Sequence, residues 1–123
     1  MLLDKAQALN SFWSNFGLTA YDENTVPDGA QLPYITYEVA TNSFDDGDVT
    51  LTASLWYFGR SWAEISQKAD EIAQKIGFGG YTIKTDTGYL WIKRRTPFAQ
   101  RMGDENENIR RILLSISAEY IDY

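Results

Sequence analysis

The sequence predicts one α+β domain, spanning residues 1–123, in which an antiparallel or mixed β-sheet has two helices packed on one face. Two observations lead to this prediction. Two stretches repeat apolar residues with the period of a helix, and five others are rich in β-branched and aromatic residues or alternate between apolar and polar. Their order is α-β-β-α-β-β-β, and neither a linker nor an internal repeat divides them.

The first predicted helix lies near the start of the chain and ends at Gly17. Apolar residues recur in it at alternating steps of four and three, which places them on one helix face. They are Leu2, Ala6, Leu9, Trp13 and Phe16. Residues 18–33 contain VPDGAQLP, and this density of Pro, Gly and Asp predicts a loop with turns.

A β-hairpin is predicted next. Its strands are YITYEVA (Tyr34–Ala40) and VTLTASLWYF (Val49–Phe58), and its turn is NSFDDGD (Asn42–Asp48). The second strand ends in three consecutive aromatic residues, which cannot all face the same side of a sheet. Either the sheet is covered on both faces, or at least one of these side chains is exposed where another subunit could bury it.

The second helix is predicted from Ser61, because Ser61 and Glu64 have the spacing of a capping box and an apolar stripe follows them. The stripe consists of Trp62, Ile65, Ala69, Ile72 and Ile76. GFGG (Gly77–Gly80) ends the helix. Phosphate-binding glycine loops precede a helix, whereas these glycines follow one, so we interpret them as a helix stop.

Three strands are predicted in the remainder of the chain. Two short ones surround the DTG turn within Tyr81–Arg95, and an alternating one covers Ile109–Ile121. Between them, residues 96–108 are expected to form a charged loop bracketed by arginine pairs, in RRTPFAQRMGDENENIRR. Hairpin loops usually have about 2–5 residues. We therefore expect this long loop to project from the sheet edge and to be mobile in an isolated subunit.

The composition argues against catalysis. The chain has no Cys and no His, which removes thiol chemistry and the commonest general base and transition-metal ligand. We therefore expect no enzyme activity and no cofactor. The sequence shows neither a run of about 18 apolar residues nor the pattern of a signal peptide, so we expect no membrane association and a cytoplasmic location where the protein is made.

Two acidic clusters have a metal site as an alternative interpretation. Asp45–Asp48 in the first hairpin turn lacks the alternating ligands and the final Glu of a calcium-binding EF-hand loop. Asp104, Glu105 and Glu107 would resemble a two-metal carboxylate site, but they lie in an expected loop without a partner base. We interpret the first cluster as a solvated turn and predict no metal site.

Charge is unevenly distributed along the chain, whose net charge is −6. Residues 1–58 carry one basic and eight acidic side chains, whereas residues 59–123 carry ten basic and nine acidic ones. The basic side chains concentrate around the expected loop, where they could contact phosphate groups or pair with acids of the loop or of a neighbouring chain. Because nucleic-acid binders usually carry a basic footprint and this chain is acidic, we favour pairing with acids.

Several segments together resemble a known family. They are LPYITYEV, SWAEISQKADEIAQKI, GGYTIKTDTGYLWIKR and PFAQRMGDENENIRRILLSISAEY. From about Leu32 to Tyr120, the chain is similar to tail-terminator and tail-completion proteins of long-tailed phages and prophages. Pro97–Arg111 and the alternating strand after it carry the resemblance most specifically, and no catalytic motif contributes to it.

The resemblance implies a structural virion protein at the head–tail junction, assembled in the host cytoplasm, whose copies form a ring, commonly a hexamer. Such a ring caps the tail tube, ends its polymerisation and joins it to the head connector. The implied partners are further copies of the chain, tail-tube protein and head–tail connector proteins. DNA passes through the lumen without specific binding, which an acidic wall would favour. A head-side completion or stopper protein and a small monomeric or dimeric binding module are the alternatives.

We expect oppositely charged side chains to carry the contacts between subunits, because heterologous contacts that close on themselves form rings. The candidate basic residues are Arg94, Arg95, Arg101, Arg110 and Arg111. The candidate acidic residues are Asp104, Glu105 and Glu107 of the loop, or Asp45, Asp46 and Asp48 of the first hairpin turn.

Overall fold

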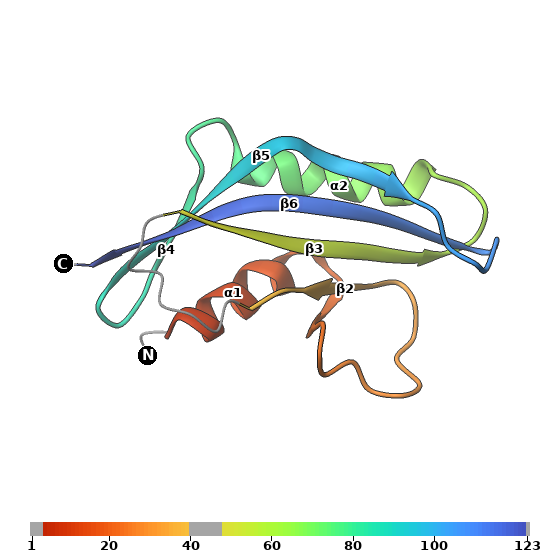
Figure 1. Cartoon of the computed structure of the whole chain (residues 1–123), viewed down its shortest axis with the longest axis horizontal. Coiled ribbons are helices and arrows are strands. Elements are labelled where there is room, and N and C mark those ends of the chain that lie inside the picture. The colour runs from red at the N-terminus through yellow and green to blue at the C-terminus, as the bar shows by residue number, and fades with distance from the viewer. Residues whose placement is uncertain (1–3, 40–47, 123) are drawn as a thin grey trace.

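The computed structural model describes residues 4–39 and 48–122, which form a six-stranded sheet with two α-helices (Figure 1). The helices are α1 (Lys5–Trp13) and α2 (Ala63–Ile76), and a short 3-10 helix, η1 (Ser14–Phe16), follows α1 directly. The strands are β1 (Thr19–Asp22), β2 (Tyr34–Tyr37), β3 (Val49–Phe58), β4 (Tyr81–Lys84), β5 (Gly88–Met102) and β6 (Ile109–Asp122). The predicted fold class and the order of the predicted elements are confirmed.

The sheet is mixed, with the order β1-β2-β3-β6-β5-β4 and a single parallel pair, β1 with β2, among the described strands. Both predicted hairpin pairings, β2 with β3 and β4 with β5, are confirmed. The expectation that residues 18–33 form only a loop is wrong at its start, because Thr19–Asp22 pairs with Tyr34–Tyr37. Four residues are too few to show a recognisable alternation, so pairing with β2 defines this strand.

Both helices pack on one face of the sheet, and the core lies between them and the strands. Ile35, Leu55, Leu114 and Ile92, from four neighbouring strands, are fully buried there. The sheet is curved enough for α1 to contact both edge strands, β1 and β4. No helix among the described residues covers the opposite sheet face.

The start of α2 differs from the prediction. The helix begins at Ala63, and Trp62 occupies the N-cap position without a side-chain cap. The capping box predicted for Ser61 and Glu64 is therefore wrong, and the Ser61 hydroxyl instead accepts a hydrogen bond from the Ala63 N–H (3.1 Å). The apolar stripe is confirmed at its four helical members, which are buried: Ile65, Ala69, Ile72 and Ile76.

The loop predicted over residues 96–108 is mostly strand. β5 continues to Met102, so residues 103–108 alone connect it to β6. A wide bulge interrupts the pairing: Arg94 lies opposite Ile116 and Ala99 opposite Leu114, so β5 advances five residues while β6 advances two. The strand after the bulge is mostly exposed, and its polar sequence therefore lacks the apolar alternation by which strands are recognised.

Candidate assembly surfaces

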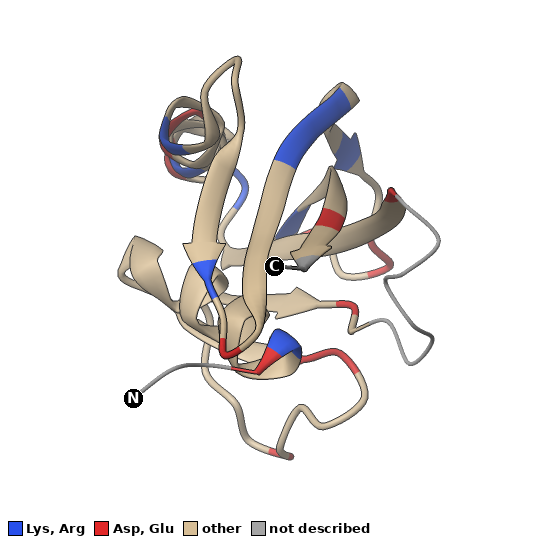
Figure 2. Cartoon of the chain, turned by 90° about the vertical axis from the view of Figure 1, so that its left-hand side faces the viewer, with Lys and Arg blue, Asp and Glu red and all other residues tan. Residues whose placement is uncertain are grey.

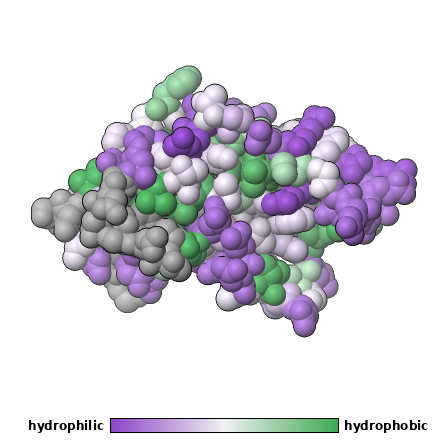
Figure 3. Space-filling view, in the orientation of Figure 1, coloured by the Kyte–Doolittle hydropathy of each residue, from purple (hydrophilic) through white to green (hydrophobic). Residues whose placement is uncertain are grey.

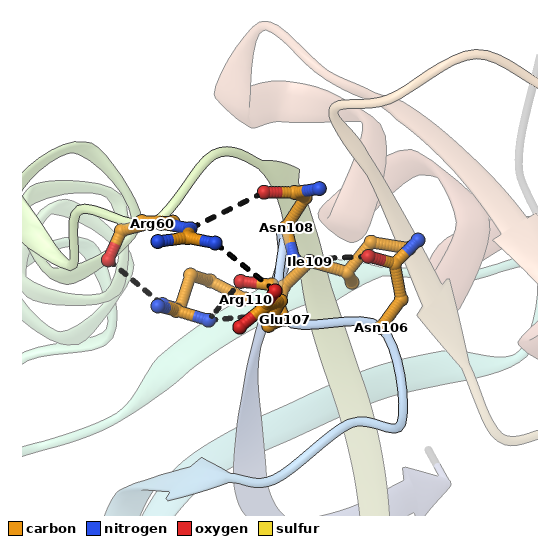
Figure 4. Close-up of polar contacts among 6 residues, drawn as sticks. All are labelled: Arg60, Asn106, Glu107, Asn108, Ile109 and Arg110. Atoms are coloured by element: carbon orange, nitrogen blue, oxygen red, sulfur yellow. Dashed lines mark hydrogen bonds and ion pairs between the residues drawn. The ribbon is translucent and has the colours of Figure 1, made fainter.

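The loop between β5 and β6 is fastened to the segment between β3 and α2 (Figure 4). The Arg60 guanidinium forms an ion pair with Glu107 (3.0 Å) and donates to the Asn108 side-chain oxygen (3.4 Å). The Gly59 N–H donates to the Asn108 carbonyl (2.6 Å). Arg110 donates to the carbonyls of Arg60 (2.9 Å) and Glu107 (3.0 Å). The loop thus packs against its own chain, which counts against the expectation that it is mobile in an isolated subunit.

Two of the candidate interface arginines contact the ring of Trp62. The Cζ atom of Arg101 lies 4.8 Å from the centroid of the indole, and that of Arg110 lies 5.1 Å from it. Each such cation–π contact contributes about 0.5–1 kcal/mol at an exposed site. These contacts hold Trp62 just before the first turn of α2, which gives a physical reason for the later start of the helix.

The sheet face without helices carries a row of aromatic side chains. The ring centroids of Tyr21 and Tyr34 are 5.6 Å apart, and those of Tyr34 and Trp56 are 6.5 Å apart. The Arg111 guanidinium lies 4.8 Å from the Trp56 centroid and donates to the Ser54 hydroxyl (3.0 Å). Arg111, another candidate interface residue, is therefore engaged within its own chain on this face.

An open groove of about 320 Å³ lies between the end of β3 and the start of α2, and we call it the β3–α2 groove. Tyr57–Ser61 and Ala63–Ile65 line it. Phe58 is 74% exposed, so one of the three consecutive aromatic residues does point to solvent. Burial raises the pKa of Tyr57 above its ordinary value of about 10, and the Glu64 and Glu71 carboxylates raise it further.

A second open groove, of about 440 Å³, lies beyond the other end of α2, beside the bulge, and we call it the β5 groove. Gly77, Phe78, Lys93–Thr96 and Phe98 line it. The Phe78 side chain is fully exposed, and the Arg94 Cζ lies 5.1 Å from the centroid of its ring. Figure 2 shows the basic stretch of β5 at the top of the view, beside the connection from α2 to β4.

The basic residues of the β5 groove differ in their partners. Lys93 forms an ion pair with Asp48 (3.5 Å), which joins one predicted acid to the basic stretch. By contrast, no carboxylate of the described residues forms an ion pair with Arg94 or Arg95. Arg95 is exposed, so its charge faces solvent.

The remaining predicted acids are not brought together with the predicted arginines. Asp45 and Asp46 lie outside the described residues. Asp104 accepts a hydrogen bond from the Asn106 N–H (2.9 Å), and Glu105 is exposed. Within the described part of the chain, neither Asp104 nor Glu105 takes part in an ion pair.

Three residues that shape these surfaces were not predicted from the sequence. Arg60 was not singled out, Trp62 was assigned to the apolar stripe of α2, and Phe78 was treated only as part of a helix stop. A signal for Phe78 was present, because a helix stop of glycines needs no aromatic residue between them. Such a residue has to be explained by another role.

Two further features concern chemistry and membranes. The described residues contain no group of three or more His, Cys, Asp or Glu positioned to share a metal ion. None of the described helices is long and apolar enough to cross a bilayer.

The fold and these surfaces define a small α+β protein with a curved mixed sheet, helices on one face, and a groove at each end of α2. No protein-family model and no curated protein matches the chain. Among solved structures, it is similar to a chain of the "Virion of native gene transfer agent (GTA) particle", with a TM-score of 0.56 and 18% identity. The similarity covers 94% of this chain and 96% of that one, and it shows a shared fold.

Proposed function

We propose that this protein is a structural component of a phage-like virion, and that its copies form a ring at the head–tail junction. The observation that carries the proposal is the shared fold with a chain of a gene transfer agent virion over nearly the whole length of both chains. Because the likeness covers 94% of this chain and 96% of that one, it concerns the whole fold described here and supports a similar structural role.

The surface supports a role in assembly. Phe58 and Phe78 are exposed large apolar side chains, and Trp, Tyr and Arg gather in the contacts around Trp62 and Trp56. These residue types are enriched in interface cores and hot spots. Figure 3 shows apolar patches set among hydrophilic side chains, with a strongly hydrophilic right-hand end where the loop between β5 and β6 lies in Figure 1.

In the proposed role the protein is not an enzyme and needs no cofactor. The ring, commonly a hexamer in the family that the sequence resembles, caps the tail tube, stops tube polymerisation and joins the tube to the head connector. DNA passes through its lumen without specific binding, and the net charge of −6 suits this because a negatively charged wall repels the DNA backbone. Such a protein is located in the virion after assembly in the host cytoplasm.

The test is assembly followed by tube capping. We expect light scattering over a wide range of protein concentrations to show a closed oligomer, and electron microscopy to show rings. Added to polymerising tail-tube protein, the chain should shorten the tubes and appear at one end of each. A head-side stopper would bind the connector and leave tube length unchanged. A monomer at every concentration that never reaches tube ends would refute the proposal.

A further inference from the structure

Phe78 is displayed to solvent by a turn that is itself rigidly held. The Trp91 indole N–H donates to the Gly79 carbonyl (2.8 Å), which fixes the turn onto β5. Gly80 has φ +88°, and a Cβ there would lie 2.8 Å from the Ile92 carbonyl oxygen and closer still to the Trp91 ring nitrogen. The backbone at Gly80 therefore lies too close to β5 to leave room for a Cβ, and Phe78 projects to solvent from this closely packed turn.

The chemistry around Phe78 is that of an interface anchor. Its ring is fully exposed, with the guanidinium of Arg94 near it and the exposed Arg95 next in the chain. No acid of the described residues neutralises either arginine. An exposed aromatic ring beside unpaired arginines fits a partner that offers an apolar cavity bordered by carboxylates.

The β3–α2 groove offers that combination. Its volume is about 320 Å³, and an enclosed cavity of about 150 Å³ already accepts a benzene ring. Its lining includes the half-buried Tyr57, the largely exposed Phe58 and Ala63, together with Glu64. The loop carrying Asp104 and Glu105 is tied to the edge of this groove through Arg60, and neither of these acids has an ion-pair partner in the described chain.

We propose that Phe78 of one copy of this chain inserts into the β3–α2 groove of the next copy. In this contact Arg94 and Arg95 face the carboxylates of Glu64 and of the loop between β5 and β6. The inference rests on the proposed ring and names the surfaces that would form it.

The geometry within one chain requires the contact to be made between copies. The turn with Phe78 follows the last residue of α2 and the β3–α2 groove lies at the first, and these ends point to opposite sides of the molecule (Figure 1). The 14 residues of α2 separate them by roughly 20 Å. Two different surfaces that meet head to tail generate a ring or an open filament.

The first experiment removes the anchor. We expect Phe78→Ser to raise the protein concentration at half-assembly at least about thirtyfold, as for a hot spot. The matched control is Ile121→Ser, which removes another exposed apolar side chain (42% exposed) near the C-terminal end of β6. This control should change the concentration at half-assembly by less than about threefold. Circular dichroism checks that both variants are folded, since neither side chain belongs to the core.

The second experiment tests the direction of the contact. Phe78→Ser keeps the groove and loses the anchor, whereas Ala63→Arg keeps the anchor and fills the groove with a cation. At concentrations where the wild type assembles, each variant alone should stay monomeric. An equimolar mixture should form dimers and nothing larger, because the two surfaces left over in each dimer are the two that the substitutions have disabled. Mixtures that stay monomeric would overturn the inference.

A charge reversal adds an independent readout. Arg95→Glu should weaken assembly, and Glu105→Arg in the same chain should restore it, whereas Lys84→Glu, at an exposed position on β4, should have little effect.

If the wild type forms rings and Phe78→Ser forms them equally well, this inference fails and the proposed function stands. A wild type that never assembles overturns both. If the variants weaken binding to a DNA duplex and leave assembly unchanged, the β5 groove is a phosphate site and the inference is wrong.

Discussion

The substitution Gly80→Ala should be unusually costly, because two separate penalties fall on one methyl group. Gly80 has φ +88°, a conformation that costs an L-residue about 1–2 kcal/mol. The new Cβ would also lie 2.8 Å from the Ile92 carbonyl oxygen and 2.9 Å from Cδ1 of Trp91. Overpacking of this kind costs about 1–3 kcal/mol. The expected loss of unfolding free energy is therefore about 2–5 kcal/mol.

The chain contains a matched control for the steric part of this cost. Gly29 has φ +87°, and no atom lies within 4 Å of a Cβ built there. Gly29→Ala should therefore cost only the backbone penalty of about 1–2 kcal/mol. The stabilisation of about 0.4–1 kcal/mol from the stiffer unfolded chain applies to both variants and cancels in their difference. That difference isolates the close approach of Gly80 to β5.

The assay is urea unfolding of the wild type and the two variants. The dependence of the unfolding free energy on urea concentration should be the same in all three proteins, which checks that each unfolds in two states. We expect Gly80→Ala to be less stable than Gly29→Ala by about 1–3 kcal/mol. Tryptophan fluorescence should also change, because Trp91 is the side chain that has to move. Equal losses in the two variants, within about 0.5 kcal/mol, would show that the turn yields freely, and the rigid display of Phe78 would lose its basis.

Three further predictions follow from single contacts. Since the pKa of Tyr57 is raised in the folded protein, the stability linked to its protonated form is complete below about pH 10 and is lost as pH rises through the raised pKa. Tyr57→Phe should therefore make the free energy of urea unfolding decline less steeply at alkaline pH. Equal declines in the wild type and the variant would contradict this. Arg110→Lys keeps the charge and loses the hydrogen bonds from the guanidinium to the carbonyls of Arg60 and Glu107. The free energy of unfolding should therefore fall by about 1–2 kcal/mol, and amide hydrogen exchange in the loop between β5 and β6 should accelerate. Unchanged exchange would count against the contact. Leu114→Ala, at a fully buried site in the middle of the sheet, should cost about 2–5 kcal/mol by chemical denaturation, and a loss under about 1 kcal/mol would show that the core is not where we place it.

Elements with a long, regular pattern could be predicted from the sequence. The stripe from Ile65 to Ile76 defined α2, and the alternation of β6 defined its buried face. The stripe is buried in the core, and so are the alternating residues Ile112, Leu114, Ile116 and Ala118 of β6, whereas Tyr120 is only partly buried. β1 and the outer part of β5 could not be predicted in the same way. Their residues are few or exposed, so pairing with a neighbouring strand decides their structure and leaves no local pattern.

The candidate site was predicted only as a set of charges. The distribution of charge indicated acids or phosphate groups as partners of the arginines, but the choice of partner depends on which elements meet in the fold. Trp62 was expected in the apolar stripe of α2; it is only partly buried against the core, and its ring also contacts Arg101 and Arg110. Arg60, four positions before Glu64 in the sequence, takes Glu107 as its partner from 47 residues away. No pattern in the sequence reports a contact at that separation.

These intrachain contacts change which charges remain for a partner. An arginine whose guanidinium already stacks on an indole or donates to carbonyls of its own chain has a structural role, and moving it to a partner would leave those groups unsatisfied. Arg101, Arg110 and Arg111 belong to this group. Arg94 and Arg95 have no acid of the described chain to neutralise them, and both line the β5 groove with the fully exposed Phe78. The fold gives no reason for an uncovered phenylalanine at a glycine turn, whereas contact between copies does, so the β5 groove is the surface where mutation should separate folding from assembly.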